Sequence, residues 1–243
     1  MKEKNRIALI TGANKGIGFE TAKHLGSLGF EILVGSRDEE RGKKALTQLA
    51  EEGIKSHLIL LDVTKQGTID DAKKQIEKEF DSLDVLINNV GISIDKSVSP
   101  SELELDVLKE TFETNFFGMF AVTKAMLPLL KKSPGGRIVN LSSGLGSLYI
   151  NSDPESEFYK YNLLAYQSSK TAVNALTVML AKEYKNTTIK INAADPGFTA
   201  TDLNGHRGYR TVQQAANVVV QLATLDENGA TGGFFNENGV IPW

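Results

Sequence analysis

The sequence predicts a single α/β domain over residues 1–243, built on a doubly wound, mainly parallel sheet of about seven strands with helices on both faces. Short apolar runs rich in β-branched residues alternate along the chain with longer segments of helical periodicity. The short runs are continuously apolar, as in strands that are covered on both faces. No internal repeat or Pro/Gly-rich linker divides the chain, which favours one domain.

The expected elements can be placed by residue number. The strands are residues 6–11, 31–35, 57–61, 84–88, 137–142, 189–194 and 232–236. Two crossover helices each show one apolar face, formed by Ala45, Leu46, Leu49 and Ala50 and by Ile69, Ala72, Ile76 and Phe80. The capping-box spacing of Ser101 with Glu104, and of Thr211 with Gln214, predicts the starts of two further helices.

Composition excludes disorder and gives no basis for binding polyanions. Hydrophobic residues make up 41% of the chain and charged residues 23%, which are ordinary globular values. The 27 Lys and Arg residues against 30 Asp and Glu residues leave a net charge of -3. Neither nucleic acid nor an anionic membrane is therefore an expected partner.

Residue usage also bears on metals and compartment. The absence of cysteine excludes disulfides, thiolate metal sites and thiol nucleophiles. His24, His57 and His206 are isolated and lack metal-ligand spacing, so no metal site is expected. The N-terminus has no signal-peptide core, and no apolar stretch approaches the roughly 18 residues that span a bilayer. We therefore expect a cytoplasmic protein.

A glycine-rich turn, TGANKGIG at residues 11–18, follows the first expected strand and opens a helix. Glycines in this context permit a tight turn and let backbone N–H groups approach a pyrophosphate at the positive end of the helix. The turn therefore predicts a dinucleotide site; the alternative is a turn that needs glycine only for packing. The residues predicted to bind the cofactor here are Gly12, Asn14, Lys15, Gly16, Ile17 and Gly18.

The end of the second expected strand favours NADP(H). An NAD site usually has an Asp or Glu there to bind the ribose 2′-hydroxyl, whereas this chain has Ser36 followed by Arg37. Arg37 and Lys15 are two cations that can neutralise a 2′-phosphate with charge-assisted hydrogen bonds. The alternative is that both are solvated surface charges.

The turns after the third and fourth expected strands would complete the nucleotide site. Asp62, followed by Val63, is placed to accept a hydrogen bond from the adenine amino group. The sequence NNVG at residues 88–91 includes Asn89, Val90 and Gly91, and is expected to brace the turn beside the adenine ribose.

Tyr166 and Lys170 are the first candidates for chemistry. Their i, i+4 spacing in a helical segment puts both side chains on one face, about one turn apart. An ammonium near a phenol stabilises the phenolate and lowers the pKa from about 10 toward the working pH. A tyrosine in that setting can act as an acid or a base.

Taken in order, these motifs resemble the short-chain dehydrogenase/reductase family of the ordinary, non-extended type, and most of all its carbonyl reductase branch. The match spans nearly the whole chain and consists of TGANKGIG, Asp62, NNVG at 88–91, Asn115, Ser143, Tyr166 with Lys170, and Pro196-Gly197 before Thr201. The resemblance implies a Rossmann-type domain with an enzymatic site.

The resemblance also implies the role of each residue. Ser143 would polarise the substrate carbonyl, Tyr166 would exchange the proton, and Lys170 would hold the nicotinamide ribose and tune Tyr166. Asn115 would distort its helix locally and hold a water molecule in a proton relay that leads to Lys170. The residues that would border the nicotinamide are Pro196, Gly197, Thr199 and Thr201.

Two features depart from the usual family pattern. Val90 stands in the NNVG turn where the smaller alanine is usual, a change that we expect to be tolerated. Ser143 and Tyr166 are 23 residues apart, more than is usual, because residues 144–165 include a polar and aromatic excursion. This 144–165 segment is either an inert surface loop or a wall of the substrate pocket formed by Tyr149, Phe158, Tyr159 and Tyr161.

The helix over 116–130 is apolar on more than one face, which leaves a dimer or tetramer and a monomer as alternatives.

The predicted activity is the NADPH-dependent reduction of a ketone or aldehyde to an alcohol by hydride transfer. Tyr166 would be the general acid, and the partner would be a small-molecule carbonyl substrate. Two alternatives remain: a non-catalytic NADP(H)-binding sensor or scaffold protein, because fold and motif do not prove activity, and an NAD-linked alcohol dehydrogenase.

Overall fold

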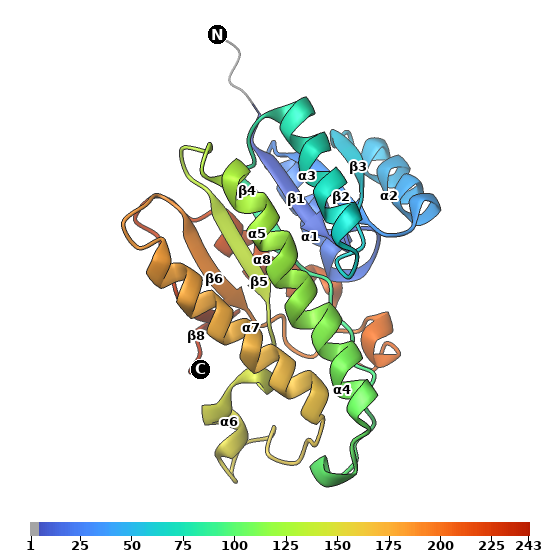
Figure 1. Ribbon diagram of the computed structural model, residues 1–243, viewed down its shortest axis with the longest axis vertical. Coiled ribbons are helices and arrows are strands. Elements are labelled where there is room, and N and C mark those ends of the chain that lie inside the picture. The colour runs from blue at the N-terminus through green and yellow to red at the C-terminus, as the bar shows by residue number, and fades with distance from the viewer. Residues whose placement is uncertain (1–4) are drawn as a thin grey trace.

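The computed structural model describes residues 5–243 of the protein. One sheet of eight strands forms its centre (Figure 1). The strand order is β3-β2-β1-β4-β5-β6-β7-β8, and only the pair of β7 and β8 is antiparallel. The strands are β1 Ile7–Thr11, β2 Glu31–Ser36, β3 Ser56–Leu60, β4 Val85–Asn88, β5 Arg137–Leu141, β6 Lys190–Ala194, β7 Phe234–Asn236 and β8 Gly239–Val240. The doubly wound, mainly parallel sheet is thus confirmed; residues 1–4 of the predicted domain lie outside the described part.

Helices cover both faces of the sheet (Figure 1). One layer contains α1 Gly16–Ser27, α2 Glu39–Glu51 and α8 Val212–Ala223. The other contains α3 Gln66–Phe80, α5 Met119–Leu130 and α7 Leu164–Glu183. The short helix α4, Leu105–Phe112, runs through a π-helical turn, Glu113–Gly118, into α5, and α6, Leu148–Ser152, lies in the 144–165 segment.

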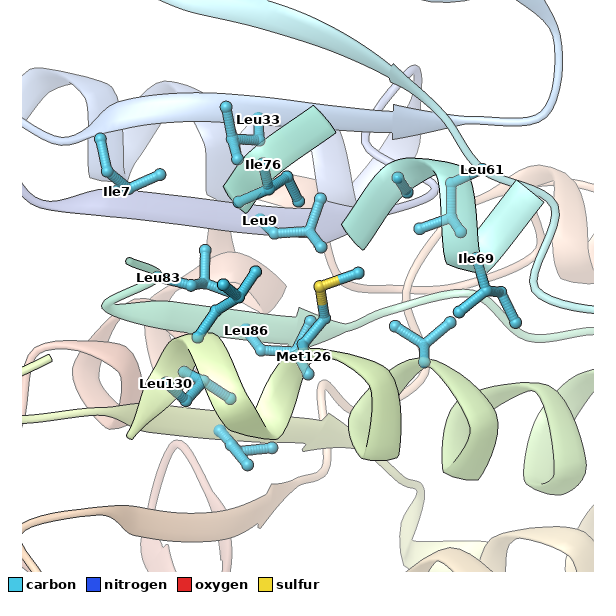
Figure 2. Packing of buried hydrophobic residues seen from close by; sticks show 14 of the residues in the cluster. Ile7, Leu9, Leu33, Leu61, Ile69, Ile76, Leu83, Leu86, Met126 and Leu130 are labelled. Atoms are coloured by element: carbon cyan, nitrogen blue, oxygen red, sulfur yellow. The ribbon is translucent and has the colours of Figure 1, made fainter. Parts of the chain in front are cut away.

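Two apolar clusters join these layers to the sheet. Alternate residues of β1 point to opposite faces, so Leu9 belongs to one cluster and Ile10 to the other. In the first cluster, Leu86 of β4 packs with Ile76 of α3 and Met126 of α5 (Figure 2). Because both faces of each inner strand are buried, the strands read in the sequence as continuous apolar runs.

Two details differ from the expected elements, and one further expectation is met. The antiparallel strand β8 is a two-residue element without a pattern of its own in the sequence. The prediction of a capping box formed by Ser101 and Glu104 is wrong, because Ser101 lies in a short 3-10 turn and α4 begins only after Glu104. The capping box of Thr211 with Gln214 is present at the start of α8.

The strand order reverses direction at β1, where β2 lies on one side and β4 on the other. In sheets of this kind ligands bind in the crevice at the carboxyl ends of the strands, beside that switch point. Gly12 follows β1, Asn89 follows β4 and Ser143 lies just beyond β5. The predicted site residues therefore gather along one edge of the sheet.

Candidate active site

Tyr166 and Lys170 lie one turn apart in the first half of α7, as their spacing predicts. The Lys170 ammonium is 5.7 Å from the centre of the Tyr166 ring and donates a hydrogen bond to the backbone carbonyl of Leu141 at 2.8 Å. Lys170 is 3% exposed, whereas the Tyr166 side chain is partly buried. The buried Lys170 ammonium therefore lies at the end of β5, beside the Tyr166 ring.

Burial is the largest influence on the ionisation of both Tyr166 and Lys170. Burial raises the pKa of Tyr166 to about 12, Asp195 and Asp95 act in the same direction, and a hydrogen bond with Ser143 opposes them. Burial also lowers the pKa of Lys170 to about 8. The expectation of a lowered pKa for Tyr166 is thus wrong, because desolvation of the phenolate outweighs the opposing hydrogen bond with Ser143.

Ser143 reaches Tyr166 because the turn after β5 packs closely on α7. A Cβ atom at Gly146 would lie 2.8 Å from the backbone carbonyl carbon of Lys170, so only glycine permits this approach. The Ser143 hydroxyl accepts a hydrogen bond from the N–H of Leu145 at 3.2 Å. Three predicted catalytic side chains, from two segments of the chain, therefore converge.

Asn115 is fully buried in the π-helical turn, where the helix deviates locally as expected. Its Oδ1 atom accepts from the N–H of Ile92, and its Nδ2 atom donates to the Ile92 carbonyl, both at 2.8 Å. Nδ2 also donates to the Ser169 hydroxyl at 3.0 Å. A Cβ atom at Gly91 would lie 3.4 Å from the Lys170 ammonium and 3.5 Å from Asn115 Oδ1, so Gly91 lies beside both.

A row of buried polar side chains lies beneath this site. Asn88 of β4 donates to Asn140 of β5 and to Thr123 of α5, both at 2.8 Å. Asn140 in turn donates to Thr177 of α7 at 2.9 Å. Because buried polar groups require such partners, the row joins two strands and two helices in one arrangement.

The glycine-rich turn has the backbone that its sequence predicts. Gly12 and Gly16 have positive φ values of 66° and 60°, where other residues are strained. A Cβ atom at Gly18 would lie 2.5 Å from the Asn89 amide nitrogen, which donates to the Thr11 carbonyl at 2.8 Å. No side chain caps the start of α1, which leaves its first N–H groups available to an anion.

The two predicted phosphate-binding cations have different surroundings. Lys15 forms an ion pair with Asp202, in the loop that follows β6. Arg37 is exposed after Ser36, whose hydroxyl donates to the Asp38 carbonyl at 2.8 Å. The cations therefore flank the end of β2 and the glycine turn, and only Lys15 has a charged partner among the described residues.

The other nucleotide-side residues lie along the same edge. The Asp62 carboxylate accepts from the N–H and hydroxyl of Thr64 at 3.1 and 2.8 Å. Val63 is 6% exposed and packs in the first apolar cluster. Val90, although larger than the usual alanine, donates its N–H to the Thr11 hydroxyl at 3.2 Å. The side chains of Asn14 and Ile17 lie partly buried in the turn.

The loop after β6 crosses toward the glycine turn. Gly197 has a positive φ of 71°, and the buried Thr199 hydroxyl donates to the Pro196 carbonyl at 3.1 Å. A Cβ atom at Gly16 would lie 3.8 Å from the Thr201 methyl group. The loop from Pro196 to Thr201 therefore reaches the glycine turn through Thr201.

The 144–165 segment brings one of its four aromatic residues to the site. A Cβ atom at Gly144 would lie 3.1 Å from the Phe158 ring, so this ring lies against the residue after Ser143. Tyr149, Tyr159 and Tyr161 are exposed at 69%, 55% and 43%. The segment is anchored by Asn151, which accepts from the Gln167 amide of α7 at 2.9 Å.

Two carboxylates near the phenol were not among the predicted site residues. Asp95, in the loop after β4, accepts from the first turn of α7, and Asp195 accepts from the N–H of Gly197 at 3.0 Å. Burial raises the pKa of Asp195, while the N–H groups of Gly197 and Gly144 and the charge of Arg210 oppose the change. Its place directly before Pro196-Gly197, at the end of β6, is a signal that would have found Asp195.

Neither a metal site nor a membrane span is found in the described part of the chain. Within residues 5–243, no group of three or more His, Asp and Glu side chains is placed to hold a metal ion. No helix there is long and apolar enough to cross a bilayer.

The sheet topology and the glycine-rich turn after β1 together define a dinucleotide-binding α/β protein of the Rossmann type. Residues 6–210 match the family model for short chain dehydrogenases. The chain therefore belongs to the short-chain dehydrogenase/reductase family, a family of oxidoreductases. The prediction made from the motifs is confirmed.

Known relatives extend along most of the chain. The short-chain dehydrogenase anuI of Penicillium roqueforti is 38% identical and covers 90% of this chain and 88% of its own length. Mouse carbonyl reductase [NADPH] 1 is 30% identical, with full coverage of both chains. The NADPH-bound carbonyl reductase from chicken fatty liver superimposes with a TM-score of 0.85 at 27% identity, over 99% of this chain and 100% of that one.

Proposed function

We propose that the protein uses NADPH to reduce a ketone or aldehyde to an alcohol. The observation that carries the proposal is the convergence of the Ser143 hydroxyl, the Tyr166 phenol and the Lys170 ammonium at one edge of the sheet. The similarity to carbonyl reductases whose names specify NADPH supports the same cofactor and reaction class.

The residues at the carboxyl ends of the strands suit the proposed cofactor. The positive φ values of Gly12 and Gly16, the close approach at Gly18 and the uncapped start of α1 suit a pyrophosphate. Lys15 and Arg37 would hold the 2′-phosphate, while Asp62 and the turn of Asn89 would border the adenosine. Lys170 and the loop from Pro196 to Thr201 would hold the nicotinamide end, where the bound cofactor supplies the hydride.

The protein side of the proposed reaction is a proton transfer. The Ser143 hydroxyl would donate a hydrogen bond to the carbonyl oxygen and orient the substrate. The Tyr166 hydroxyl would give its proton to that oxygen as negative charge develops there. Since burial raises the pKa of Tyr166 to about 12, the phenol is protonated at neutral pH, as an acid in the reductive direction must be.

Replacement of the phenol tests this assignment. Tyr166→Phe is expected to reduce carbonyl reduction by at least roughly a thousandfold, while the Kd for NADPH stays within about twofold of the parent value. Tyr184→Phe, at the far end of the same helix, is the matched control and should keep full activity. A Tyr166→Phe protein with ordinary turnover would refute the role of Tyr166.

A panel of ketones and aldehydes, followed by NADPH absorbance, separates an enzyme from a sensor. The proposed reductase should oxidise NADPH with several of these compounds, whereas NADPH binding without any turnover would favour a sensor or scaffold. Similar efficiency with NADH would favour the NAD-linked alternative.

The exposed faces of the helices near the site bear on assembly. Phe117 is 51% exposed and Phe120 is 43% exposed, close to the start of α5. Exposed aromatic residues of this kind suit a contact between copies, so we extend the proposal to a homo-oligomer. Sedimentation of the parent and of Phe120→Lys tests it: a parent monomer would contradict this part of the proposal.

A further inference from the structure

The side chain of Asp95 contacts the start of the helix that carries Tyr166. Its Oδ2 atom accepts hydrogen bonds from the backbone N–H groups of Ala165 at 3.0 Å and of Tyr166 at 3.2 Å. These bonds join residues 70 and 71 positions apart in the chain. The loop after β4 is thereby attached to the helix that carries the phenol.

These two N–H groups are the ones that an N-cap side chain ordinarily satisfies. The N-cap residue of α7 is Leu163, which has no polar side chain and makes no capping hydrogen bond. In a helix the N-cap oxygen accepts from the second or third helical residue, here Ala165 and Tyr166. Asp95 therefore replaces the missing cap from another segment.

The carboxylate of Asp95, bound to the backbone of Tyr166, is also near enough to act on the ionisation of the phenol. Its second oxygen, Oδ1, is buried without a hydrogen-bond partner among the described residues. The other groups that face Tyr166 are the Ser143 hydroxyl after β5, Asp195 after β6 and the Lys170 ammonium on α7. A carboxylate in this surrounding opposes the formation of a second negative charge on the phenol oxygen.

We propose that Asp95 is a positioning residue for the reaction: its carboxylate fixes the first turn of α7, and its charge keeps the Tyr166 proton in place. The proposal rests on the function proposed for Tyr166. Burial remains the largest reason for the raised pKa of Tyr166, and Asp95 adds to it in the same direction as Asp195.

Asp95→Asn removes the negative charge of the side chain but keeps its hydrogen bonds to the start of α7. The amide oxygen can accept from Ala165 and Tyr166, while the amide nitrogen takes the place of Oδ1. Without the charge, Tyr166 should ionise on the order of half a pH unit lower. In the alcohol-oxidation direction, where phenolate is the base, the rise of kcat/KM with pH should move to lower pH by the same amount.

A second readout does not depend on catalysis. The ring Cζ carbon resonance of 13C-labelled tyrosine reports ionisation, and Tyr166→Phe identifies the signal of Tyr166 by its loss. The Tyr166 signal of Asp95→Asn should titrate at lower pH than in the parent. If Tyr166 proves to have no catalytic role, this titration still tests Asp95, so the two failures can be distinguished.

Two further variants complete the test. Asp95→Ala removes the cap as well as the charge and is expected to lower kcat roughly tenfold, with an unchanged Kd for NADPH. Asp106→Asn is the control, because it removes an exposed carboxylate that only pairs with Lys109 at 3.3 Å. Titration curves of Asp95→Asn that superimpose on those of the parent, or full kcat in Asp95→Ala, would overturn the proposal.

Discussion

Lys15 in the glycine turn forms an ion pair with Asp202, which lies 187 residues further along the chain. The pair joins the turn after β1 to the loop after β6, across the crevice proposed to hold the cofactor. A 2′-phosphate would therefore compete with Asp202 for the Lys15 ammonium. Asp202 has another partner, because it accepts from His206 at 2.8 Å.

Removal of this competitor should strengthen cofactor binding. Asp202→Asn is expected to lower the Kd for NADPH about threefold, a modest change because exposed ion pairs are weak and screened. The Kd for NADH, which has no 2′-phosphate, should stay constant, and Asp106→Asn is the control for net charge. Weaker NADPH binding in Asp202→Asn would show instead that the pair organises the site. Isothermal titration calorimetry at low and high salt gives both constants.

Arg37 should carry much of the preference for NADPH. Arg37→Ala is expected to raise KM for NADPH roughly tenfold and to leave KM for NADH unchanged, because the substitution removes only the contact between Arg37 and the 2′-phosphate, which NADH lacks. Lys44→Ala on α2 removes an exposed cation of the same charge and should change neither constant. Equal effects of Arg37→Ala on both cofactors would contradict a phosphate contact.

Gly146 should be intolerant of any side chain. Gly146→Ala places a methyl group 2.8 Å from the Lys170 backbone and is expected to cost about 1–3 kcal/mol of stability. The turn that carries Ser143 should also move away from α7, so kcat should fall. Gly67→Ala, at a position with nothing within 4 Å, is the control and should be neutral or slightly stabilising. Denaturant unfolding of the two variants compares them directly.

The buried ammonium of Lys170 should make stability depend on pH. Its pKa is lowered to about 8 in the folded protein, so between about pH 8 and 10.5 the unfolded chain binds more protons, and stability rises with pH. Lys170→Met should therefore be more stable than the parent at pH 7, by on the order of 2 kcal/mol, and lose this advantage toward pH 10.

Thermal unfolding of the cofactor-free proteins from pH 7 to 10 measures this difference. The raised pKa of Tyr166 acts only above about pH 10, where it lowers stability as the pH rises, so the two effects are separated. Lys44→Met is the exposed control. A difference between Lys170→Met and the parent that stays constant with pH would show that the ammonium is not destabilised by burial.

The 144–165 segment should determine substrate preference through Phe158. Phe158→Ala is expected to raise KM for bulky apolar carbonyl compounds several-fold relative to small ones, because the ring lies against Gly144 beside Ser143. Tyr159→Ala, 55% exposed in the native protein, should change neither value. Replacement of residues 150–162 with a short turn should change the substrate profile, and an unchanged profile would indicate an inert loop.

The sheet could be predicted from the sequence because strands covered on both faces produce continuous apolar runs. Residues of the glycine turn could be found because backbone geometry demands glycine at Gly12 and Gly16. Ser143, Tyr166 and Lys170 were identified through motifs in order along the chain, and their convergence depends on the topology that the same patterns predict.

Other features depend on contacts that no local pattern reveals. Asp95 contacts Ala165 from 70 positions away, in a loop without periodicity. The Lys15–Asp202 pair forms only once β1 and β6 lie in one sheet. The direction of the pKa of Tyr166 depends on how deeply the folded chain buries the phenol, and i, i+4 spacing does not contain that quantity.

The hydrogen-bonded row of Asn88, Asn140, Thr123 and Thr177 has a consequence for laboratory evolution. It holds the floor of the site on rigid strands and helices, whereas Phe158 and the loop after Pro196 form walls on connecting segments. Mutational tolerance should therefore be low in the floor and high in the walls. Libraries confined to the walls would diversify the accepted carbonyl compounds and still deliver folded protein.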